Sequence, residues 1–202
     1  MASRDYEKYL NVVWCFIALW MAYHTFLQIW VMAEMEPFVW FFLHGLTAVL
    51  FLVRKKPIHY SSSVMGYCVS LASVHYYFLY DFTVSVPSFW GFFGKGVTGI
   101  GGLLCIASTL SLGRCFGILP IYRGVETRAM YQFIRHPIYL SYLVLDAGIL
   151  MTYFTFANFL IFLIAVLLFI VRIRYEEDVL QLSDAYWDYK RKVKYKLIPG
   201  VY

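Results

Sequence analysis

Charged residues are scarce in this sequence. Only 14% of its 202 residues are Asp, Glu, Lys or Arg, whereas 61% are hydrophobic. Soluble domains average about 25% charged and about 45–50% apolar residues, so the composition excludes an ordinary soluble domain. No ten-residue segment alternates apolar and polar residues as the strands of a membrane barrel do. The sequence therefore predicts an all-α, polytopic membrane protein, because a helix satisfies its own backbone hydrogen bonds in lipid.

Cysteine pairs and metal-binding patterns are also lacking. No CxxC spacing joins the four cysteines, which are Cys15, Cys68, Cys105 and Cys115. Neither a disulfide framework nor a zinc site is therefore expected. Three histidines without HExxH spacing lie in separate apolar runs, namely His24, His44 and His75. We interpret them as groups that hydrogen-bond between helices.

Six apolar runs are candidates for membrane-spanning helices, each of which needs about 17–25 residues. They extend from about Leu10 to Ala33, Pro37 to Val53, Ser63 to Tyr80, Phe89 to Leu112, Pro137 to Tyr153 and Thr155 to Ile173. The first is too long for a signal-peptide core and is interpreted as a retained helix. Because no linker or repeat divides the runs, we expect one domain over residues 1–202. Residues 1–90 are interpreted as packing helices, and nearly every polar cluster lies in 94–202.

Basic residues occur only in alternate connections between these runs. They follow the second run, separate the fourth from the fifth and recur in the tail, whereas the opposite connections contain Glu34, Glu36 and Asp81. Because cytoplasmic loops carry the excess of Lys and Arg, we expect both termini in the cytoplasm, in a bacterial inner membrane or the endoplasmic reticulum. This topology explains the net charge of +5, so the expected partners are membrane lipids and not nucleic acid.

Glycine and the tail suggest how a site could be enclosed. The fourth run is rich in glycine, with glycines at positions 94, 96, 99, 101 and 102 among them. Small residues let membrane helices approach closely, and a bare backbone also accepts a ligand, so both interpretations are open. In the tail, residues 174–196 carry apolar side chains at steps of three or four. This period is typical of a helix lying at the membrane interface, where it could seal a site from water.

Two polar clusters flank the last two runs. Arg135 and His136 precede Pro137, which suits the first turn of a helix, and the N-terminus of a helix attracts anions. The second cluster consists of Arg172, Arg174, Glu176, Glu177 and Asp178. In the structural interpretation, the first cluster only anchors the end of a span at the cytoplasmic surface. The second cluster then forms ordinary i,i+4 ion pairs along a helix. The functional interpretation is that three adjacent carboxylates hold a cationic or donor-rich ligand, because the short turn between the runs returns both clusters to one membrane face.

These motifs resemble the isoprenylcysteine carboxyl methyltransferase and phospholipid methyltransferase superfamily of integral membrane methyltransferases. The similarity covers residues 103–202, and four ordered motifs are more specific than any one alone. The motifs are Leu112-Gly113-Arg114 before Pro120, Tyr131 with Arg135-His136-Pro137 and Tyr139, Arg172 with Glu176-Glu177, and Tyr186 with Tyr189. The chain departs from the family at Ala129 and Ser141, where glycine is frequent.

The resemblance implies S-adenosylmethionine as methyl donor, bound at the cytoplasmic side, and a methyltransferase-like catalytic core in residues 94–202. It implies that His136 and Tyr139 contact this cofactor and that Glu176 and Glu177 bind its polar groups. Related phospholipid enzymes use a Gly-x-Gly in the preceding span, which Gly99 and Gly101 match. The candidate catalytic residues, expected near the methyl-transfer site, are Arg135, Arg172 and Arg114. The expected acceptor is lipophilic, a prenylcysteine carboxylate or a lipid amine, and enters laterally between helices.

Two other functions fit the sequence. A sterol-reductase-like membrane enzyme has similar C-terminal helices but uses NADPH. A small carrier or scaffold would use Asp146, in the middle of the fifth run, with the three histidines as pathway residues. A carboxyl at that depth is costly, so Asp146 is either functional or a protonated structural group.

Overall fold

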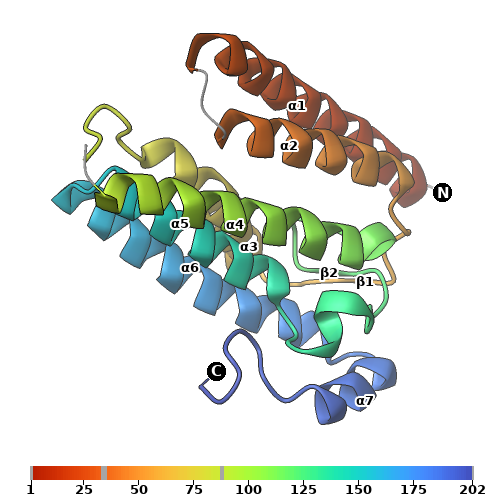
Figure 1. The fold of residues 1–202 in the computed structure, drawn as a ribbon. Coiled ribbons are helices and arrows are strands. Elements are labelled where there is room, and N and C mark those ends of the chain that lie inside the picture. The colour runs from red at the N-terminus through yellow and green to blue at the C-terminus, as the bar shows by residue number, and fades with distance from the viewer. Residues whose placement is uncertain (1, 33–35, 87–88, 202) are drawn as a thin grey trace.

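The helices follow the apolar runs closely. The computed structural model describes residues 2–32, 36–86 and 89–201, and its elements are labelled in Figure 1. The helices are α1 (Ala2–Met32), α2 (Glu36–Val53), α3 (Val64–His75) with the 3-10 turn η1 (Tyr76–Leu79), α4 (Phe89–Leu112), α5 (Pro137–Thr152), α6 (Phe156–Leu180) and α7 (Asp184–Lys192). Two further 3-10 turns are η2 (Gly113–Cys115) and η3 (Ala129–Gln132). An all-α membrane protein, as expected from composition, fits this architecture.

Three segments are long and apolar enough to cross a membrane, namely Glu7–Leu27, Phe89–Cys115 and Phe156–Leu180. Shorter apolar helices of 10–17 residues occur at Pro37–Val53, Val64–Leu79 and Pro137–Thr152. A helix rises about 1.5 Å per residue, so each of these reaches about 25 Å or less against a hydrocarbon core of about 30 Å. All six apolar runs are helical, and the count of six spans stays a prediction.

Side chains at the helix starts explain several boundaries. Ser63 precedes α3, and its hydroxyl accepts a hydrogen bond from the backbone N–H of Gly66 at 3.0 Å. Thr155 caps α6 in the same way through the N–H of Asn158, also at 3.0 Å. Such caps satisfy N–H groups that have no partner within the helix. Pro137 begins α5 where its missing N–H costs nothing, as the sequence predicts.

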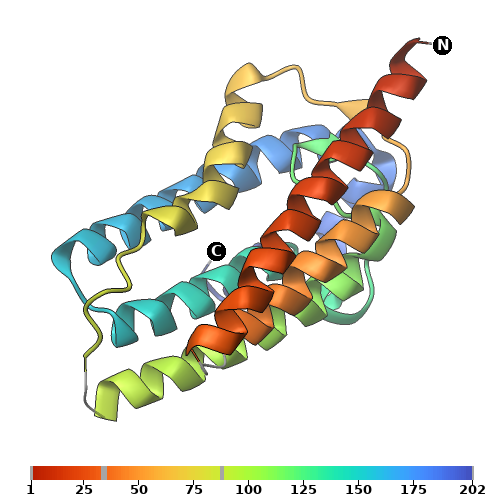
Figure 2. The same cartoon turned by 90° about the horizontal axis from the view of Figure 1, so that it is seen from above.

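The helices form an open arc. Neighbours along it are α1 with α2, α2 with α4, α4 with α5, α5 with α6, and α6 with α3. Figure 2 shows α1 and α2 on one side of the molecule and α3 with α6 on the other. The two ends of the arc thus face each other across the interior.

Close packing of α4 on α5 accounts for part of the glycine-rich run. A Cβ at Gly101 would lie 2.4 Å from the backbone nitrogen of Leu145, and one at Gly94 would lie 2.5 Å from Oγ1 of Thr152. On α5, a Cβ at Gly148 would meet the backbone nitrogen of Thr98 at 2.3 Å. Such approaches exclude any larger residue, so the packing interpretation holds at these positions. Gly99 differs, because nothing lies within 4 Å of the Cβ position there.

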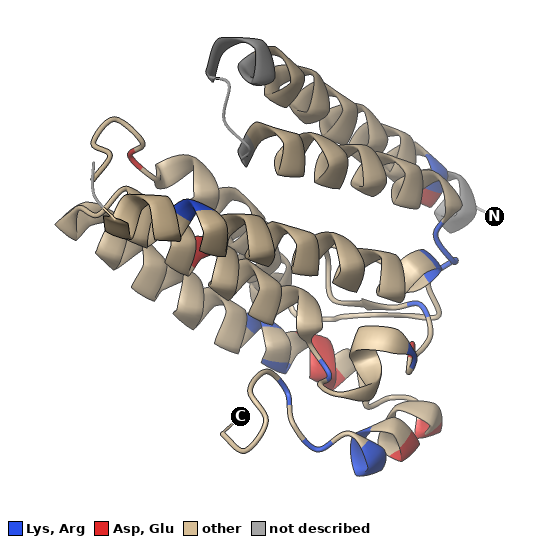
Figure 3. Ribbon diagram, in the orientation of Figure 1, with Lys and Arg blue, Asp and Glu red and all other residues tan. Residues whose placement is uncertain are grey.

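The connections at the basic end interlock. Strand β1 (His59–Tyr60) pairs antiparallel with β2 (Ile121–Tyr122), which joins the α2–α3 connection to the α4–α5 connection. Figure 3 shows most Lys and Arg residues at this end, near the N-terminus and α7. Lys95, in the second turn of α4, departs from the expected segregation of basic residues. Of the acidic residues expected at the other end, Glu34 and the side chain of Glu36 lie outside the described residues, and Asp81 is exposed.

The tail differs from the sequence prediction in its helix boundaries. Helix α6 continues past Ile173 to Leu180, and a separate α7 begins at Asp184, so residues 174–196 are not one interfacial helix. The charges after Ile173 end the apolar run but not the helix, because charged residues with long side chains are good helix formers. The stripe is nevertheless buried at five positions, Val179, Tyr186, Tyr189, Val193 and Leu197, whereas Leu182 is exposed.

Candidate functional site

A cavity of about 690 Å³ lies inside the arc. Its walls come from α1, α2, α3 with η1, the connection between α4 and α5, α5, α6 and α7. Charged and phenolic groups line the end near α7, including Arg135, His136, Tyr139, Arg172 and Glu176. Aromatic side chains of α1, α2, η1 and the connection after η1 line the rest, among them Trp14, Trp20, Trp40, Tyr77 and Phe82. The cavity therefore has one polar end and one largely apolar end, and the helices before residue 90 form much of its wall.

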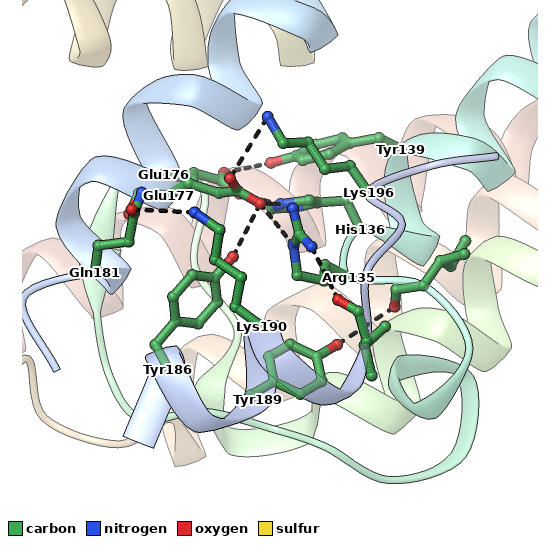
Figure 4. A network of polar contacts seen from close by, with 12 residues as sticks. Arg135, His136, Tyr139, Glu176, Glu177, Gln181, Tyr186, Tyr189, Lys190 and Lys196 are labelled. Carbon is green, nitrogen blue, oxygen red and sulfur yellow. Dashed lines mark hydrogen bonds and ion pairs between the residues drawn. The ribbon is translucent and has the colours of Figure 1, made fainter. Parts of the chain in front are cut away.

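Glu177 is the centre of the polar network in Figure 4. Its carboxylate is buried, with 3% of the residue exposed. Oε1 accepts hydrogen bonds from Nε of Arg135 at 2.8 Å and from the hydroxyl of Tyr186 at 3.0 Å, and Nε2 of His136 lies 3.3 Å away. Nζ of Lys196 lies 3.5 Å from Oε2. The cations that Glu177 holds are thus the protein's own, and this carboxylate joins α5, α6 and the tail.

Glu176 faces the other way, toward the cavity. Its side chain is 19% exposed and lies on the cavity wall. Oε1 accepts hydrogen bonds from the hydroxyl of Tyr139 and from Nε of Arg172, the latter at 3.0 Å. Oε2 lies 3.8 Å from Nδ1 of His136. The predicted i,i+4 pair of Arg172 with Glu176 is therefore present, and Glu176 keeps a partly accessible carboxylate for a ligand.

The three successive carboxylates do not form one site. Glu177 is buried toward the tail, Glu176 borders the cavity and Asp178 is exposed. Helical geometry explains this, because successive side chains on a helix point about 100° apart. A single cationic ligand held by all three is therefore incompatible with the structure.

Arg172 braces three parts of the chain from the cavity wall. It is 5% exposed, and its guanidinium lies over the ring of Tyr139 at 5.1 Å. Besides Glu176, it donates to the hydroxyl of Ser73 on α3 at 2.8 Å and to the carbonyl of Ile118 at 2.6 Å. Its planar fork is therefore engaged in three directions. Sequence reasoning missed Ser73, because nothing near it in the chain signals a partner 99 positions away.

Arg135 and Arg114 differ in whether their guanidinium N–H groups can reach a ligand in the cavity. Arg135 donates through Nη1 to the carbonyls of Val193 and Lys194, at 2.9 and 2.7 Å. Within the described part of the chain no hydrogen bond uses its Nη2, and the residue lines the cavity. Arg114 instead is exposed, and its Nε donates to the carbonyl of Val53 at 2.8 Å. The structure thus places Arg114 against the end of α2, away from the polar cluster, where it braces the connection after α4.

Helix α7 closes the polar end with phenols. The hydroxyl of Tyr189 donates to the carbonyl of Tyr131 at 2.6 Å, which holds η3 against the tail. Burial raises the pKa of Tyr189 above its usual range. Burial and the adjacent Glu177 carboxylate likewise raise the pKa of Tyr186. Both phenols therefore remain neutral hydrogen-bond donors at physiological pH.

The glycine pair and the histidines lie apart from the polar cluster. Neither Gly99 nor Gly101 is among the residues that line the cavity, and Gly101 is pressed against Leu145. His24, His44 and His75 all line the cavity. Nδ1 of His75 bonds the carbonyl of Leu71 in its own helix at 2.8 Å, so its expected role between helices is wrong. The rings of His24 and His44 pack against Trp20 and Trp40, with centroids 4.5 and 5.7 Å apart.

The structure explains the conformation or contacts of Ala129 and Ser141, the two positions where the chain departs from the family motifs. Ala129 adopts φ of 50°, the left-handed region that favours glycine, which explains why glycine is frequent there. Ser141 is buried, and its hydroxyl lies 3.2 Å from that of Ser108 on α4. Neither residue belongs to the cavity wall. Among residues 2–32, 36–86 and 89–201 no group of three or more His, Cys, Asp or Glu could hold a metal ion.

Residues 118–182 match the model of the isoprenylcysteine carboxyl methyltransferase (ICMT) family. The matched segment begins near the start of the α4–α5 connection and ends just past α6, so it contains the polar groups of α5 and α6 described above. The resemblance inferred from the sequence motifs is thereby confirmed, and the match indicates a membrane methyltransferase. Arg114, Gly99 and Gly101 lie outside the matched residues. No individual curated protein matches the chain.

Proposed function

Because residues 118–182 match the isoprenylcysteine carboxyl methyltransferase family, we propose that this protein transfers a methyl group from S-adenosylmethionine to a lipophilic acceptor. The observation that carries the proposal is the cavity of about 690 Å³ with a charged end and an aromatic remainder. A polar donor and an apolar acceptor need opposite surroundings. This cavity provides both in one space.

The polar end fits the groups of the proposed donor. S-adenosylmethionine carries a carboxylate, an ammonium, a ribose diol and a sulfonium, which supplies the methyl group. Glu176 has a partly accessible carboxylate that can accept from the ammonium or the diol. Nη2 of Arg135 can donate to the donor carboxylate, and arginine is well suited to that pairing. Tyr139 and Tyr186 also line this end, and their hydroxyls donate to Glu176 and Glu177 and so orient the two carboxylates.

The remaining candidate residues act by positioning these groups. Arg172 holds Glu176 and stacks on Tyr139, so both ligand-facing side chains depend on it. The buried carboxylate of Glu177 fixes the side chains of Arg135 and His136 through its contacts with Nε of Arg135 and Nε2 of His136. Methyl transfer from a sulfonium is an in-line displacement, in which alignment and exclusion of water contribute more than acid or base help. In this proposal the network of Glu177 supplies that alignment, and α7 covers the reacting atoms.

The acceptor would enter from the lipid through the open side of the arc. Side chains of α1 and of α3 with η1 line the same cavity, including Trp20, Met21, Val74 and Phe78. The enclosing helices are apolar and suit a bilayer. A lipophilic molecule could therefore pass between them, with its polar group directed toward Glu176 and Tyr139. We place this polar end on the cytoplasmic side, because the adjoining connections carry the basic residues.

The decisive experiment combines binding and turnover. The purified chain in nanodiscs is titrated with labelled S-adenosylmethionine and, separately, with labelled NADPH. It is then supplied with labelled methyl donor and a total lipid extract, and the labelled product is identified. Saturable binding of S-adenosylmethionine with transfer into a lipophilic product is expected. Binding of NADPH alone, or no transfer into lipid, contradicts the proposal.

A further inference from the structure

Helix α2 presents two polar side chains to the cavity within a mostly aromatic and aliphatic face. Its cavity-lining residues recur at steps of three or four, as residues on one face of a helix do. They are Pro37, Trp40, Leu43, His44, Thr47 and Phe51. His44 and Thr47 are three positions apart, so their side chains are neighbours on this face.

Neither side chain has a hydrogen-bond partner in the part of the chain that the structure describes. The ring of His44 packs against that of Trp40, with centroids 5.7 Å apart, and this contact leaves the ring nitrogens unbonded. Both His44 and Thr47 are half-buried and line the cavity, so a ligand can reach them. The hydrogen bond to another helix that the sequence predicts for His44 is thus absent among the described residues.

Thr25 on α1 shows how a threonine in this cavity can satisfy itself. It also lines the cavity, but its hydroxyl donates to the carbonyls of Met21 and Ala22, at 3.1 and 2.9 Å. Such back-bonding is the usual arrangement for a threonine inside a helix. The hydroxyl of Thr47 has no such bond and is therefore free to contact a ligand.

The end of α2 relates this pair to the charged end of the cavity. The ring of Phe51 lies 5.6 Å from that of Phe116, in the connection between α4 and α5. Two residues later, the carbonyl of Ile118 accepts a hydrogen bond from Arg172. Phe51 therefore marks the level at which α2 borders the charged end.

The pair lies deeper than this level, toward the aromatic end. A helix rises about 1.5 Å per residue, so Thr47 lies about 6 Å and His44 about 10 Å before Phe51 along α2. One turn further, the ring of Trp40 meets that of Tyr77 on η1, with centroids 4.5 Å apart. A molecule that extends from the charged end to this aromatic contact passes the pair.

The chemistry of the pair selects what it can bind. An uncharged imidazole has one N–H donor, and a threonine hydroxyl supplies a second donor. Because the two side chains are neighbours, one oxygen atom of a ligand can accept from both. A hydrocarbon would leave both donors unpaired in apolar surroundings, which costs free energy.

We propose that His44 and Thr47 form a subsite that binds an oxygen atom on the lipophilic part of the acceptor. The inference rests on the proposed methyltransferase function for the identity of the occupant. It narrows the acceptor class to a lipophilic molecule with a carbonyl or hydroxyl oxygen one to two helical turns beyond the charged end. A plain hydrocarbon chain does not satisfy this subsite.

A series of simple probes tests the subsite without methyl transfer. In keto derivatives of 1-dodecanol, one ketone is moved along the chain while the hydroxyl end and the apolar surface stay nearly the same. Trp14, Trp20 and Trp40 line the cavity, so intrinsic fluorescence reports binding. The full chain in nanodiscs is titrated with each isomer in the presence of S-adenosylmethionine. We expect one or two adjacent ketone positions to bind about tenfold more tightly than the others, since each of two hydrogen bonds contributes about threefold.

Variants separate the two donors from general packing. Thr47→Val and His44→Phe each remove one donor and should reduce this preference to about threefold, whereas the double variant should have none. His44→Gln keeps a donor and should retain part of the preference. Thr25→Val is the matched control, because it removes a hydroxyl that lines the same cavity but is already bonded within its helix. This control should keep the full preference.

Each outcome decides for or against the subsite. Equal binding of all isomers, or a positional preference that survives in the folded variants, overturns it. Weaker binding of labelled S-adenosylmethionine to Thr47→Val also overturns it, because the pair would then belong to the methyl donor. If His44→Phe does not fold, Thr47→Val decides the question. Absence of S-adenosylmethionine binding to the unaltered protein, together with an intact ketone preference, would contradict the proposed function and not the subsite.

Discussion

Nε of Arg135 donates to Oε1 of Glu177 at 2.8 Å, across 42 positions of the sequence. This contact links the start of α5 to the end of α6, and Tyr186 and Lys196 extend it to the tail. The backbone N–H groups of Arg135 and His136 donate to the carbonyls of Tyr195 and Lys196, at 3.0 and 2.9 Å. The tail is thus fixed over the polar end of the cavity by side chains and by main chain together.

Glu177→Gln should destabilise the protein and loosen the tail. The substitution leaves the buried Arg135 without its charge partner, and breaking such a pair costs about 3–5 kcal/mol. We expect a lower midpoint of thermal unfolding in detergent and faster proteolysis after the lysines of the tail. Asp178→Asn serves as the control, because it removes the same charge at the next, exposed position. Equal stability of the two variants would refute the central role given to Glu177.

Glu176→Gln should weaken S-adenosylmethionine binding with little loss of stability. Glu176 lines the cavity and is partly accessible, so its charge is available to the ligand. Loss of a charged hydrogen bond costs about 1.5–3 kcal/mol, which is about 10-fold to 150-fold in the dissociation constant. Equilibrium binding of the labelled cofactor measures the effect, with Asp178→Asn again as the control. An unchanged dissociation constant would remove Glu176 from the site.

Arg172→Lys should reduce both stability and methyl transfer although the charge is kept. A lysine ammonium cannot replace a planar fork that bonds Ser73, Ile118 and Glu176 in three directions. The loss of one charged hydrogen bond in this setting lowers the free energy of unfolding by about 1.5–3 kcal/mol. Arg174→Lys is the matched control, because Arg174 lies on the same helix and is exposed. Denaturant titration and the labelled-methyl assay together check the prediction.

The sequence was most informative where a local pattern determines structure. The bounds of α4 agree with the predicted run from Phe89 to Leu112, because an apolar run, a membrane and backbone hydrogen bonding all favour the same helix. Pro137 correctly predicted the start of α5. The end of α6 was predicted seven residues too early, at Ile173 and not Leu180, because the apolar period stops where the charges begin although the helix does not.

The site was predictable only in part, for a physical reason. The motifs bring attention to Arg135, His136, Glu176 and Glu177, but nothing in them distinguishes the buried carboxylate from the accessible one. That distinction depends on which side of α6 meets the tail. The partner of Asp146 is Tyr76, 70 positions earlier, and no spacing rule connects the two. Contacts between helices that are distant in the sequence could therefore not be predicted, because they depend on how those helices pack.

Gly101→Ala and Gly99→Ala should separate packing from cofactor binding in the glycine-rich helix. A methyl group at Gly101 would collide with the backbone of Leu145, and overpacking costs about 1–3 kcal/mol. At Gly99 the position is open, so stability should not fall. We expect Gly101→Ala to lower the unfolding midpoint and Gly99→Ala to leave both stability and cofactor affinity unchanged. A specific loss of affinity in Gly99→Ala would instead support a ligand against this backbone.

Glu7→Gln should weaken the attachment of α1 to the connections that form the cavity wall. The carboxylate of Glu7, on α1, lies 2.5 Å from Nη2 of Arg123 and 3.8 Å from Nη2 of Arg54, and it accepts a hydrogen bond from the hydroxyl of Tyr60 at 3.1 Å. Burial and the charge of Arg123 lower the pKa of Arg54 to about 10, so the guanidinium of Arg54 is still charged at neutral pH. Without Glu7 the two charges repel each other in a confined space.

The effect should reach the cavity because Arg123 lines it and bonds the carbonyl of Lys55 at 2.5 Å. We expect Glu7→Gln to lower the unfolding midpoint and to weaken binding of the lipophilic alcohol farnesol, measured by the fluorescence of the tryptophans that line the cavity. Glu7→Asp should retain part of both. High salt should narrow the gap between Glu7→Gln and the unaltered protein, since it screens the repulsion between Arg54 and Arg123. A variant with normal stability and normal binding at low salt would show that α1 is not held at this point.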